Sequence, residues 1–525
     1  MRSQYAKEQG GQFFTDGLIT DLTMELLEFD PEKGETLADI CAGTGGFLIS
    51  ALKKASIKPS EKPLVFGFEI DKNTAQTANA TLKSRMGLKN KNIVKVEDSL
   101  KLFDTYPELK NSFDCVASNP PFGTKITIKS PNILEKFEIA KIAKSKKPTA
   151  KQYNFVRPQP PDVLFLEQNI KAVKSEGRIA LVLPYQMLSG PQARAIREFI
   201  LKKCLVMAVV DLPADTFQPH TGTKGCLVIL KKRVKELNTL SQISKDANIF
   251  MSKPIQIGHD RRGNPIYKDG SDELLTDIPA VGEDYKRFRK GKKPLNSHSF
   301  DIPAKTLLES ENLNLNSAFH MQKTVLYNQL EYKKNQGIKF ESLGDLVEGI
   351  FCPGRFKRDY KPEGPNTVPF LGGKNITECF LNIDKHISVD HPNISELSVK
   401  SGWVLITRSG STGIASIVPE SWNGFAISEH VIRIIPKSES HITASYIFAI
   451  LRSYFLRQQL KMGVFGSVID EITPEFIASL KIPIFPENEA NRVVSLLSDF
   501  NKHREKSMSK LVKAESLISE MLSFS

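Results

Sequence analysis

Seven short apolar runs between residues 37 and 231 are the feature that most limits how this chain can fold. Each run is rich in Val, Ile and Leu, and longer amphipathic segments separate most of them, which is typical of buried strands linked by crossover helices. The last two runs have only "ADTFQPHTGTK" between them. Because that is too short for a helical crossover, the final strand should be antiparallel. We therefore expect an α/β fold with a doubly wound, seven-stranded, Rossmann-like sheet. The runs are "TLADICA", "LVFGFEI", "NIVKVED", "FDCVASN", "RIALVLP", "VMAVVDLP" and "GCLVILKK".

The texture of the sequence changes after residue 231. "DYKRFRKGKKPLNSH", residues 284–298, holds six basic residues beside Gly and Pro, and we interpret it as a linker or an exposed basic surface. From residue 337 to 486, short β-like segments alternate with Gly, Asn and Pro turns, which favours a domain of α+β or mostly β character. From Glu487, apolar residues recur near helical spacing and predict a long amphipathic helix for packing or dimerisation. The expected domains are residues 1–300, 301–486 and 487–525.

Composition narrows the functional classes. The 72 basic and 59 acidic side chains give a net charge of +13, which suggests a polyanionic partner such as nucleic acid. There is neither a signal-peptide core nor a run of about 18 apolar residues, so we expect no secretion and no membrane span. The six cysteines are scattered, without Cys/His spacing typical of a metal site. This predicts free thiols in a reducing cytoplasm and no metal.

Three predicted strand ends carry residues suited to a nucleoside-containing ligand. "DICAGTGGF", residues 39–47, is a Gly-rich turn that lets the backbone approach a ligand, and Asp39 in it suits a cationic amino group. Glu69 ends the second strand, where it could accept hydrogen bonds from both ribose hydroxyls. Asp98 could accept from an adenine amino group, and Ser99 could cap the following turn. Each feature alone is also compatible with an ordinary turn, but together they favour a nucleoside cofactor.

A fourth strand end carries "SNPPF", residues 118–122. Pro120 and Pro121 fix φ and lack backbone N–H donors, so the site is rich in acceptors, chiefly the Asn119 side-chain oxygen and the Pro120 carbonyl. Such a site can accept both hydrogens of an exocyclic amine, while Phe122 offers a stacking face for a flipped base. The alternative is a rigid turn that caps a strand.

These motifs resemble those of a known family. "GQFFT" (11–15), "DICAGTGGF", "FEID", "EDS" and "SNPPF" resemble the amino-methylating DNA methyltransferases that use S-adenosylmethionine, most closely the modification subunit of type I restriction systems. From about residue 337, "TVPFLGGKNITE" and "KSGWVLITRSGSTGIASIVPE" resemble, as a series, one target-recognition domain and the following helix of a type I specificity subunit. Two features depart from the family: Asp16 stands where a Pro is usual, and ten residues precede the first motif where modification subunits carry a helical domain.

The resemblance implies S-adenosylmethionine as cofactor, adenine as target, and a set of site residues. It assigns methyl transfer to Asn119, Pro120, Pro121 and Phe122. The cofactor set is Gln12, Phe13, Phe14, Thr15, Asp39, Ala42, Gly43, Thr44, Gly45, Glu69, Asp98 and Ser99. A lysine-rich segment (125–151) and two Gly-punctuated turns add candidate DNA contacts. These are Lys125, Lys129, Lys374, Asn375, Arg408, Ser409 and Ser411.

We therefore expect a sequence-specific adenine methyltransferase for double-stranded DNA, with modification and recognition fused in one chain of a restriction-modification system. One recognition domain per chain predicts a homodimer, joined through the terminal helix, on a bipartite site. Any cleavage would belong to a separate nuclease subunit. Two alternatives stay open: a methyltransferase for RNA or protein, and a non-catalytic DNA-binding subunit.

Overall fold

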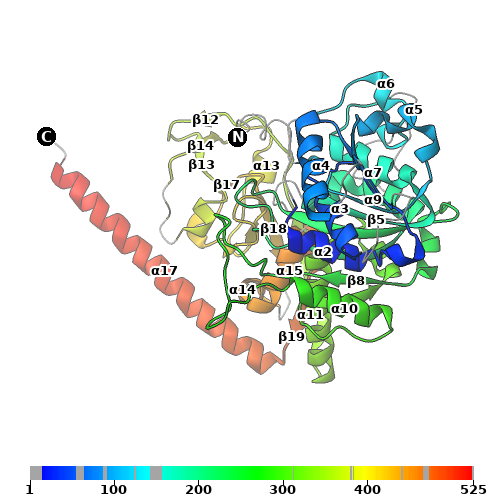
Figure 1. Cartoon of the computed structure of the whole chain (residues 1–525). Coiled ribbons are helices and arrows are strands. Elements are labelled where there is room, and N and C mark those ends of the chain that lie inside the picture. Colours follow the sequence, from blue (N-terminus) through cyan, green and yellow to red (C-terminus); the bar gives the residue numbers. More distant parts are fainter. Residues whose placement is uncertain are drawn as a thin grey trace. The chain divides into compact units, whose positions relative to one another are not determined.

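The chain folds into two compact units, Met1–Met321 and Gln322–Ser525, which are described separately (Figure 1). Helix α11 (Ser317–Asn335) contains the boundary between them. The computed structural model describes residues 15–54, 64–86, 92–122, 126–141, 156–310, 312–378, 381, 383–438, 442–464 and 472–522.

The described part of unit 1 is built on a mixed sheet of nine strands in the order β3-β2-β1-β4-β5-β7-β6-β8-β9. The seven predicted strands are β1 to β7, which occupy adjacent places in this sheet. Strand β7 is antiparallel to both β5 and β6, as predicted. The prediction of seven strands is wrong because β8 and β9 extend the sheet beyond β6. The strands are β1 (Leu37–Asp39), β2 (Val65–Glu69), β3 (Val94–Val96), β4 (Phe113–Ser118), β5 (Val173–Pro184), β6 (Cys204–Asp211), β7 (Gly225–Lys232), β8 (Asn248–Ser252) and β9 (Ser299–Pro303).

The segment interpreted as a linker, residues 284–298, belongs instead to the fold of unit 1. Residues 284–289 of this segment form the second half of helix α10 (Ile278–Arg289), a packed element in which Val281 and Tyr285 are buried. Its basic residues cluster in the last turn, where a helix favours cations. The linker interpretation is wrong because residues 284–289 lie on a helix whose other face is apolar and buried. The alternative, an exposed basic surface, agrees with the exposure of Lys286, Arg289, Lys290, Lys292 and Lys293.

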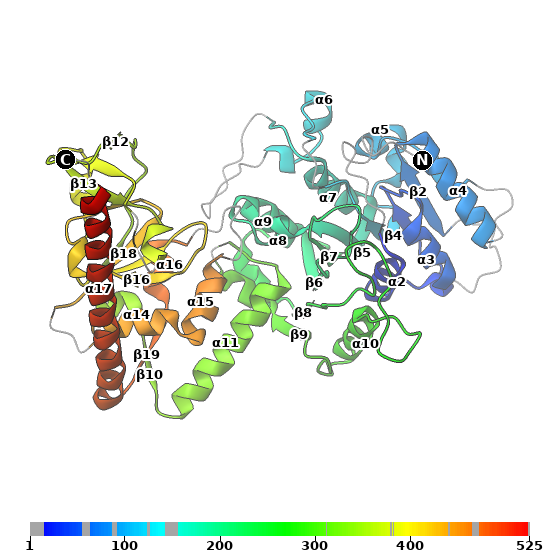
Figure 2. The same ribbon diagram turned by 90° about the vertical axis from the view of Figure 1, so that its left-hand side faces the viewer.

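Successive residues of the central strands point into different apolar cores, one on each face of the sheet. Helices lie on both faces of this sheet (Figure 2). In β5, Ile179 and Leu181 join the core that α7 and α9 cover, whereas Ala180 and Val182 join the core that α2, α3, α4 and α10 cover. Burial on both faces explains the continuous apolar runs. The helices of this unit, besides α10, include α2 (Gly17–Leu26), α3 (Gly46–Lys54), α4 (Lys72–Met86), α5 (Leu102–Thr105), α6 (Pro131–Leu134), α7 (Pro161–Ala172), α8 (Tyr185–Ser189) and α9 (Arg194–Lys203).

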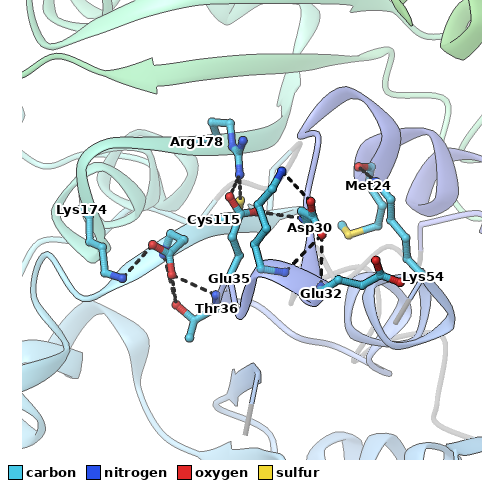
Figure 3. Close-up of polar contacts among 11 residues, drawn as sticks. Met24, Asp30, Glu32, Glu35, Thr36, Lys54, Cys115, Lys174 and Arg178 are labelled. Carbon is cyan, nitrogen blue, oxygen red and sulfur yellow. Dashed lines mark hydrogen bonds and ion pairs between the residues drawn. The ribbon is translucent and has the colours of Figure 1, made fainter. Parts of the chain in front are cut away.

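Ion pairs tie the strands together near the amino ends of β1, β4 and β5 (Figure 3). Arg178 Nη2 of β5 lies 2.5 Å from Glu35 Oε1, just ahead of β1. Asp114 Oδ2 of β4 accepts hydrogen bonds from the backbone N–H and the hydroxyl of Thr36, at 3.0 and 2.8 Å. Lys174 Nζ lies 2.7 Å from Asp114 Oδ1. These contacts fix the relative positions of three strands, two of which, β1 and β4, carry predicted site residues at their opposite ends.

In the described part of unit 2, two four-stranded sheets and a two-stranded one are combined with helices. The sheet β11-β18-β15-β16 is antiparallel, and the second has the order β12-β14-β13-β17. The strands are β10 (Lys339–Ser342), β11 (Val347–Phe351), β12 (Tyr360–Lys361), β13 (Thr367–Leu371), β14 (His386–Ser388), β15 (Val404–Thr407), β16 (Ala415–Ile417), β17 (Ala426–Ile427), β18 (Val431–Pro436) and β19 (Lys481–Ile484). The helices include α12 (Leu343–Leu346), α13 (Ile394–Leu397), α14 (Ala444–Arg452), α15 (Tyr454–Val464) and α16 (Pro474–Ser479).

The predicted C-terminal helix is present as α17 (Glu487–Leu522), a helix of 36 residues. Its first turns pack against α14, and Ala490 is buried there. Further along the helix, large apolar side chains are exposed, among them Phe500, Ile518 and Met521. In Figure 1 the helix extends in red toward the C-terminus.

Other sequence expectations concern membranes, metals and thiols. Within the described ranges, no helix is both long and apolar enough to cross a membrane. The same residues contain no group of three or more His, Cys, Asp or Glu side chains placed to hold a metal ion. Cysteines with free thiols are Cys41, Cys115, Cys204, Cys226 and Cys352. Cys379 lies outside the described residues.

Candidate active site

A cavity of about 260 Å³ lies at the carboxyl edge of the sheet, where β1, β2, β3 and β4 end. A second cavity of about 40 Å³ shares three of its lining residues, namely Cys41, Gly43 and Asn119. The larger cavity brings together the predicted residues Gly43, Glu69, Asp98, Ser99, Asn119 and Pro121. The smaller one adds Thr15, Asp39, Ala42 and Thr44. Four strand ends that are far apart in sequence thus form one site.

Asp39, at the end of β1, is a buried carboxylate held by neighbouring donors. Its Oδ1 accepts hydrogen bonds from Cys41 N and from Ser118 Oγ, each at 3.0 Å. Burial raises the pKa of Asp39 to about 7, and the negative charge of Glu69 contributes in the same direction. A cationic group in the smaller cavity would offset this cost by pairing with the carboxylate.

The Gly-rich turn after β1 is shaped by two residues with positive φ, Gly43 (+52°) and Gly45 (+87°). Gly43 N donates to Glu69 Oε2 at 3.0 Å, so the turn is fastened to the end of β2. Gly45 lines neither cavity. A Cβ at Gly45 would lie 3.6 Å from Ala78 Cβ of α4. We infer that Gly45 is needed for the backbone conformation of the turn, which leads directly into α3, and not for contact with a ligand.

Glu69 is 5% exposed and its carboxylate is fixed by backbone amides. Besides the bond from Gly43, Oε1 accepts from Asp71 N at 2.9 Å. Since each carboxylate oxygen has two lone pairs, a carboxylate held this way can still accept from ligand hydroxyls. The cavity wall around Glu69 contains apolar side chains that the sequence analysis did not single out. The additional lining residues include Ile40, Phe68, Ile70, Leu100, Ile133 and Phe165.

At the end of β3, Asp98 rather than Ser99 caps the following short helix (Ser99–Lys101). Asp98 Oδ1 accepts from Leu100 N at 3.1 Å. The expectation that Ser99 provides the cap is wrong, because the capping oxygen comes from the residue that precedes the first helical position. Both residues nevertheless line the larger cavity.

The "SNPPF" segment begins immediately after β4 and contacts the chain ahead of α2. Asn119 Nδ2 donates to Thr15 Oγ1 at 3.1 Å, across 104 sequence positions. Asp16, the departure from the family pattern, caps α2 by accepting from Leu18 N at 2.7 Å. An Asp at this position therefore starts the helix as effectively as other capping residues do, and Thr15 is held beside Asn119.

Phe122 is not an open stacking face in this structure. Its ring is 2% exposed and packs edge to face against Phe217, with centroids 5.9 Å apart. Phe217 comes from the connection between β6 and β7, and the sequence reasoning did not single it out. The available signal was an aromatic residue in the short "ADTFQPHTGTK" connection.

The predicted DNA contacts are placed in both units. Lys129 is exposed beside Ile128, which lines the larger cavity. In unit 2, Arg408, Ser409 and Ser411 form the tip of the hairpin between β15 and β16. A second turn contains Lys374 and Asn375, and it lies against this hairpin, since a Cβ on Gly373 would be 3.7 Å from Thr407 Cγ2. Gln12, Phe13, Phe14 and Lys125 lie outside the described residues, as does 142–151 of the lysine-rich segment.

Comparison with known proteins identifies the family. Residues 1–273, more than half of the 525, match the family model described as N-6 DNA methylase. The chain belongs to the N-6 DNA methylase family. Residues 335–513 match a second model, the type I restriction modification DNA specificity domain.

Curated relatives match this chain over part of their length. It is 25% identical over 242 residues to the type I restriction enzyme EcoEI methylase subunit of Escherichia coli, with 44% of each chain covered. It is 23% identical over 320 residues to the MpnII methylase subunit of Mycoplasma pneumoniae, covering 59% of this chain and 55% of that protein. The chain therefore spans about half the length of the curated relatives it matches.

Solved structures give a likeness of fold. The type IIG restriction endonuclease BpuSI aligns with 94% of this chain and with 62% of its own length, at 13% identity and a TM-score of 0.53. A type I restriction-modification methyltransferase subunit from Streptococcus thermophilus aligns over 60% of each chain, at 20% identity and a TM-score of 0.44.

Proposed function

We propose that this chain transfers a methyl group from S-adenosylmethionine to the exocyclic amine of adenine in double-stranded DNA. The observation that carries the proposal is the meeting of Asn119 and Pro121 with Gly43, Glu69 and Asp98 around one cavity. An acceptor-rich motif for an amine thus borders a site suited to a nucleoside. Membership of the N-6 DNA methylase family supports adenine as the base.

The residues around the cavities fit S-adenosylmethionine, which, when bound, supplies an electrophilic methyl group. Asp39 would pair with the ammonium of the cofactor, because its buried carboxylate has a pKa raised to about 7 by desolvation and gains most from a cation. Glu69 would accept from the ribose hydroxyls, and Asp98 from the adenine amino group. The apolar side chains of Ile70 and Phe165 would cover the faces of the cofactor's adenine ring.

Asn119 and Pro120 would hold the amine of the target base. Because Asn119 Nδ2 donates to Thr15, the atom of this amide that can accept from an amine is Oδ1. Together with the Pro120 carbonyl, it would accept both N–H hydrogens and direct the nitrogen lone pair at the methyl group. This positioning lowers the barrier without a dedicated base, since the amine can lose its proton after attack.

The target base would have to leave the duplex to reach this site. Opening of the Phe122–Phe217 pair would offer two aromatic faces to a flipped adenine, at a cost of about 1 kcal/mol for the lost ring contact. Stacking of the base returns about 1–3 kcal/mol. Phe217 therefore joins Phe122 as a proposed base-contacting residue.

Unit 2 would choose the DNA sequence. The specificity-domain match over residues 335–513 supports this role, with Lys374, Asn375, Arg408, Ser409 and Ser411 as candidate contacts and Lys129 beside the methylation site. We further propose a homodimer through the exposed apolar face of α17, which would place two recognition domains on a bipartite site. The division into residues 1–300, 301–486 and 487–525, the cytoplasmic location and a separate nuclease partner remain predictions.

The test is methylation by the purified chain with tritiated S-adenosylmethionine and duplex DNA, RNA or total protein as acceptor. We expect label in DNA as N6-methyladenine, at one sequence that methylation-sensitive sequencing identifies. Asn119→Ala should abolish labelling while equilibrium dialysis still detects cofactor binding. Label in RNA or protein but not DNA would replace the proposed substrate. Unchanged DNA labelling by Asn119→Ala would refute the assigned chemistry.

A further inference from the structure

Three chain segments of unit 2 meet in a polar cluster that the methyl-transfer chemistry does not use. The segments are residues 352–358 after β11, the hairpin tip after β15, and the turn 428–430 that leads into β18. Arg408 N donates to the backbone oxygen of His430 at 2.8 Å, which joins the second segment to the third. Cys352 Sγ donates to the backbone oxygen of Glu429 at 2.9 Å, which joins the first to the third.

Glu429 is the centre of this cluster. Its side chain is only 7% exposed, and its Oε1 accepts from Arg358 Nη2 at 2.7 Å. The other oxygen, Oε2, accepts from Ser428 Oγ at 3.1 Å. Burial by itself would raise the pKa of Glu429, but the hydrogen bonds from its own backbone and from Arg358 outweigh it and lower the pKa. The carboxylate is therefore charged at neutral pH.

Two partially exposed side chains are oriented by this carboxylate. The Arg358 side chain is 36% exposed although one of its nitrogens is bound to Glu429. His430 is 40% exposed, its Nε2 lies 3.5 Å from Glu429 Oε1, and its Nδ1 lies 2.8 Å from Ser409 Oγ. We call Arg358, Ser409, Glu429 and His430 the Glu429 cluster.

Arg408 and the buried Arg433 add positive charge near Cys352 and Ser428, but directly beside Arg358 the Glu429 carboxylate favours a neutral acceptor over a phosphate. The Glu429 carboxylate compensates the charge of Arg358 at 2.7 Å and would repel a phosphate at the same place. A guanidinium has five N–H donors, so donors remain after the contacts of Arg358 with Glu429 and Tyr360. Because its position is already fixed, Arg358 loses little side-chain entropy on binding. Guanine presents two adjacent acceptors, O6 and N7, in the major groove, and a guanidinium matches both.

We propose that the Glu429 cluster is a site for the major-groove edge of a guanine base, read by Arg358 and oriented by Glu429. Ser409 would contact the same or the adjacent base pair. The inference rests on the proposed function and deepens it, since it names one base of the recognised sequence and the residue that selects it.

The test compares methylation of duplexes that differ at one base pair of the recognised site. Arg358→Ala removes the guanidinium, Arg358→Lys keeps a cation without the planar fork, and Glu429→Gln removes the charge that holds it. Lys357→Ala, an exposed cation on the same segment, is the matched control. The measurements are kcat/KM for each duplex and the dependence of DNA affinity on salt.

We expect wild type to prefer guanine at one position, and Arg358→Ala and Arg358→Lys to reduce that preference by about 10- to 100-fold at this position only. Glu429→Gln should reduce it in the same place and to a smaller extent. Lys357→Ala should leave the preference unchanged.

Two results would overturn the inference while leaving the proposed function intact. One is unchanged discrimination by active Arg358→Ala. The other is an equal loss of affinity for all sequences, with a weaker salt dependence and rescue by Lys, which identifies a phosphate contact. If wild type itself methylates no duplex, the proposed function fails and this inference fails with it.

Discussion

Replacement of Asp39 by Asn should make unit 1 more stable at pH 8 while it abolishes cofactor binding. The reason is the position of this carboxylate, which is 1% exposed at the end of β1. Its pKa is about 7 in the folded chain and has an ordinary value of 3.8. Below about pH 4 both the folded and the unfolded chain hold the proton. Between about pH 4 and pH 7 only the folded chain holds it, so stability falls as the pH rises through this window.

The two pKa values set the size of the effect. A difference between about 7 and 3.8, at about 1.36 kcal/mol for each pKa unit, corresponds to about 4 kcal/mol of lost stability above pH 7. Asn keeps an acceptor for Cys41 N but does not titrate. The free energy of unfolding of Asp39→Asn minus that of wild type should therefore increase by about 4 kcal/mol between pH 4 and pH 8. Other titrating groups cancel in this difference.

The stability of unit 1 should be measured by hydrogen exchange of peptides from β1 and β4. Tryptophan fluorescence would report on unit 2 instead, because both tryptophans, Trp403 and Trp422, lie there. In wild type, cofactor affinity should rise about 10-fold from pH 6 to pH 8 as Asp39 loses its proton. A stability difference that does not change with pH would refute the reasoning, as would cofactor affinity that is independent of both pH and the substitution.

Two further predictions concern the base site and the terminal helix. Phe217→Leu should lower kcat/KM for DNA by about 10-fold through lost stacking, while cofactor affinity is kept. Phe250→Leu, at another buried position of the same core, should leave kcat/KM unchanged. Steady-state methylation measures kcat/KM and dialysis measures cofactor affinity, and equal losses for the two variants would show that Phe217 is only a packing residue. The double variant Phe500→Asp, Ile518→Asp should convert a dimer into a monomer without unfolding, because both side chains are at least half exposed. Light scattering after gel filtration measures the mass of the particle. A variant that stays dimeric would exclude α17 as the interface.

Most of the strands that the sequence predicts correctly are buried on both faces, and the exception is β3, an edge strand in which only Val94 is buried. The apolar runs of the others are continuous because α7 and α9 cover one face and α2 to α4 cover the other. The missed strands, β8 and β9, lie at one end of the sheet order. Strand β9 follows the exposed basic residues at the end of α10 and just after it. It lies at the edge of the sheet and therefore needs fewer apolar residues. Strand β8 lies inside the sheet, but its apolar run is only Ile249, Phe250 and Met251, which is too short to stand out in the sequence.

The candidate site was predictable where a function depends on a local motif. The Gly-rich turn, Glu69 and the Asn119 motif each sit at a strand end, and parallel strand ends meet at one edge of the sheet. The missing parts depend on distant residues. Phe217 meets Phe122 from a loop 95 positions later, and Arg358 meets Glu429 across 71 positions. Contacts between residues so far apart in the chain cannot be predicted from the spacing of residues in a single sequence.

The ion pairs at the amino edge of the sheet have a consequence for engineering. Glu35, Asp114 and Arg178 stabilise β1, β4 and β5 at the ends opposite Asp39 and Asn119 (Figure 3). An engineer can therefore strengthen contacts at this edge, or rebuild them, without touching a residue that we propose to bind cofactor or base. Such a reserve of stability would widen the range of substitutions that the carboxyl edge tolerates when new substrates are selected.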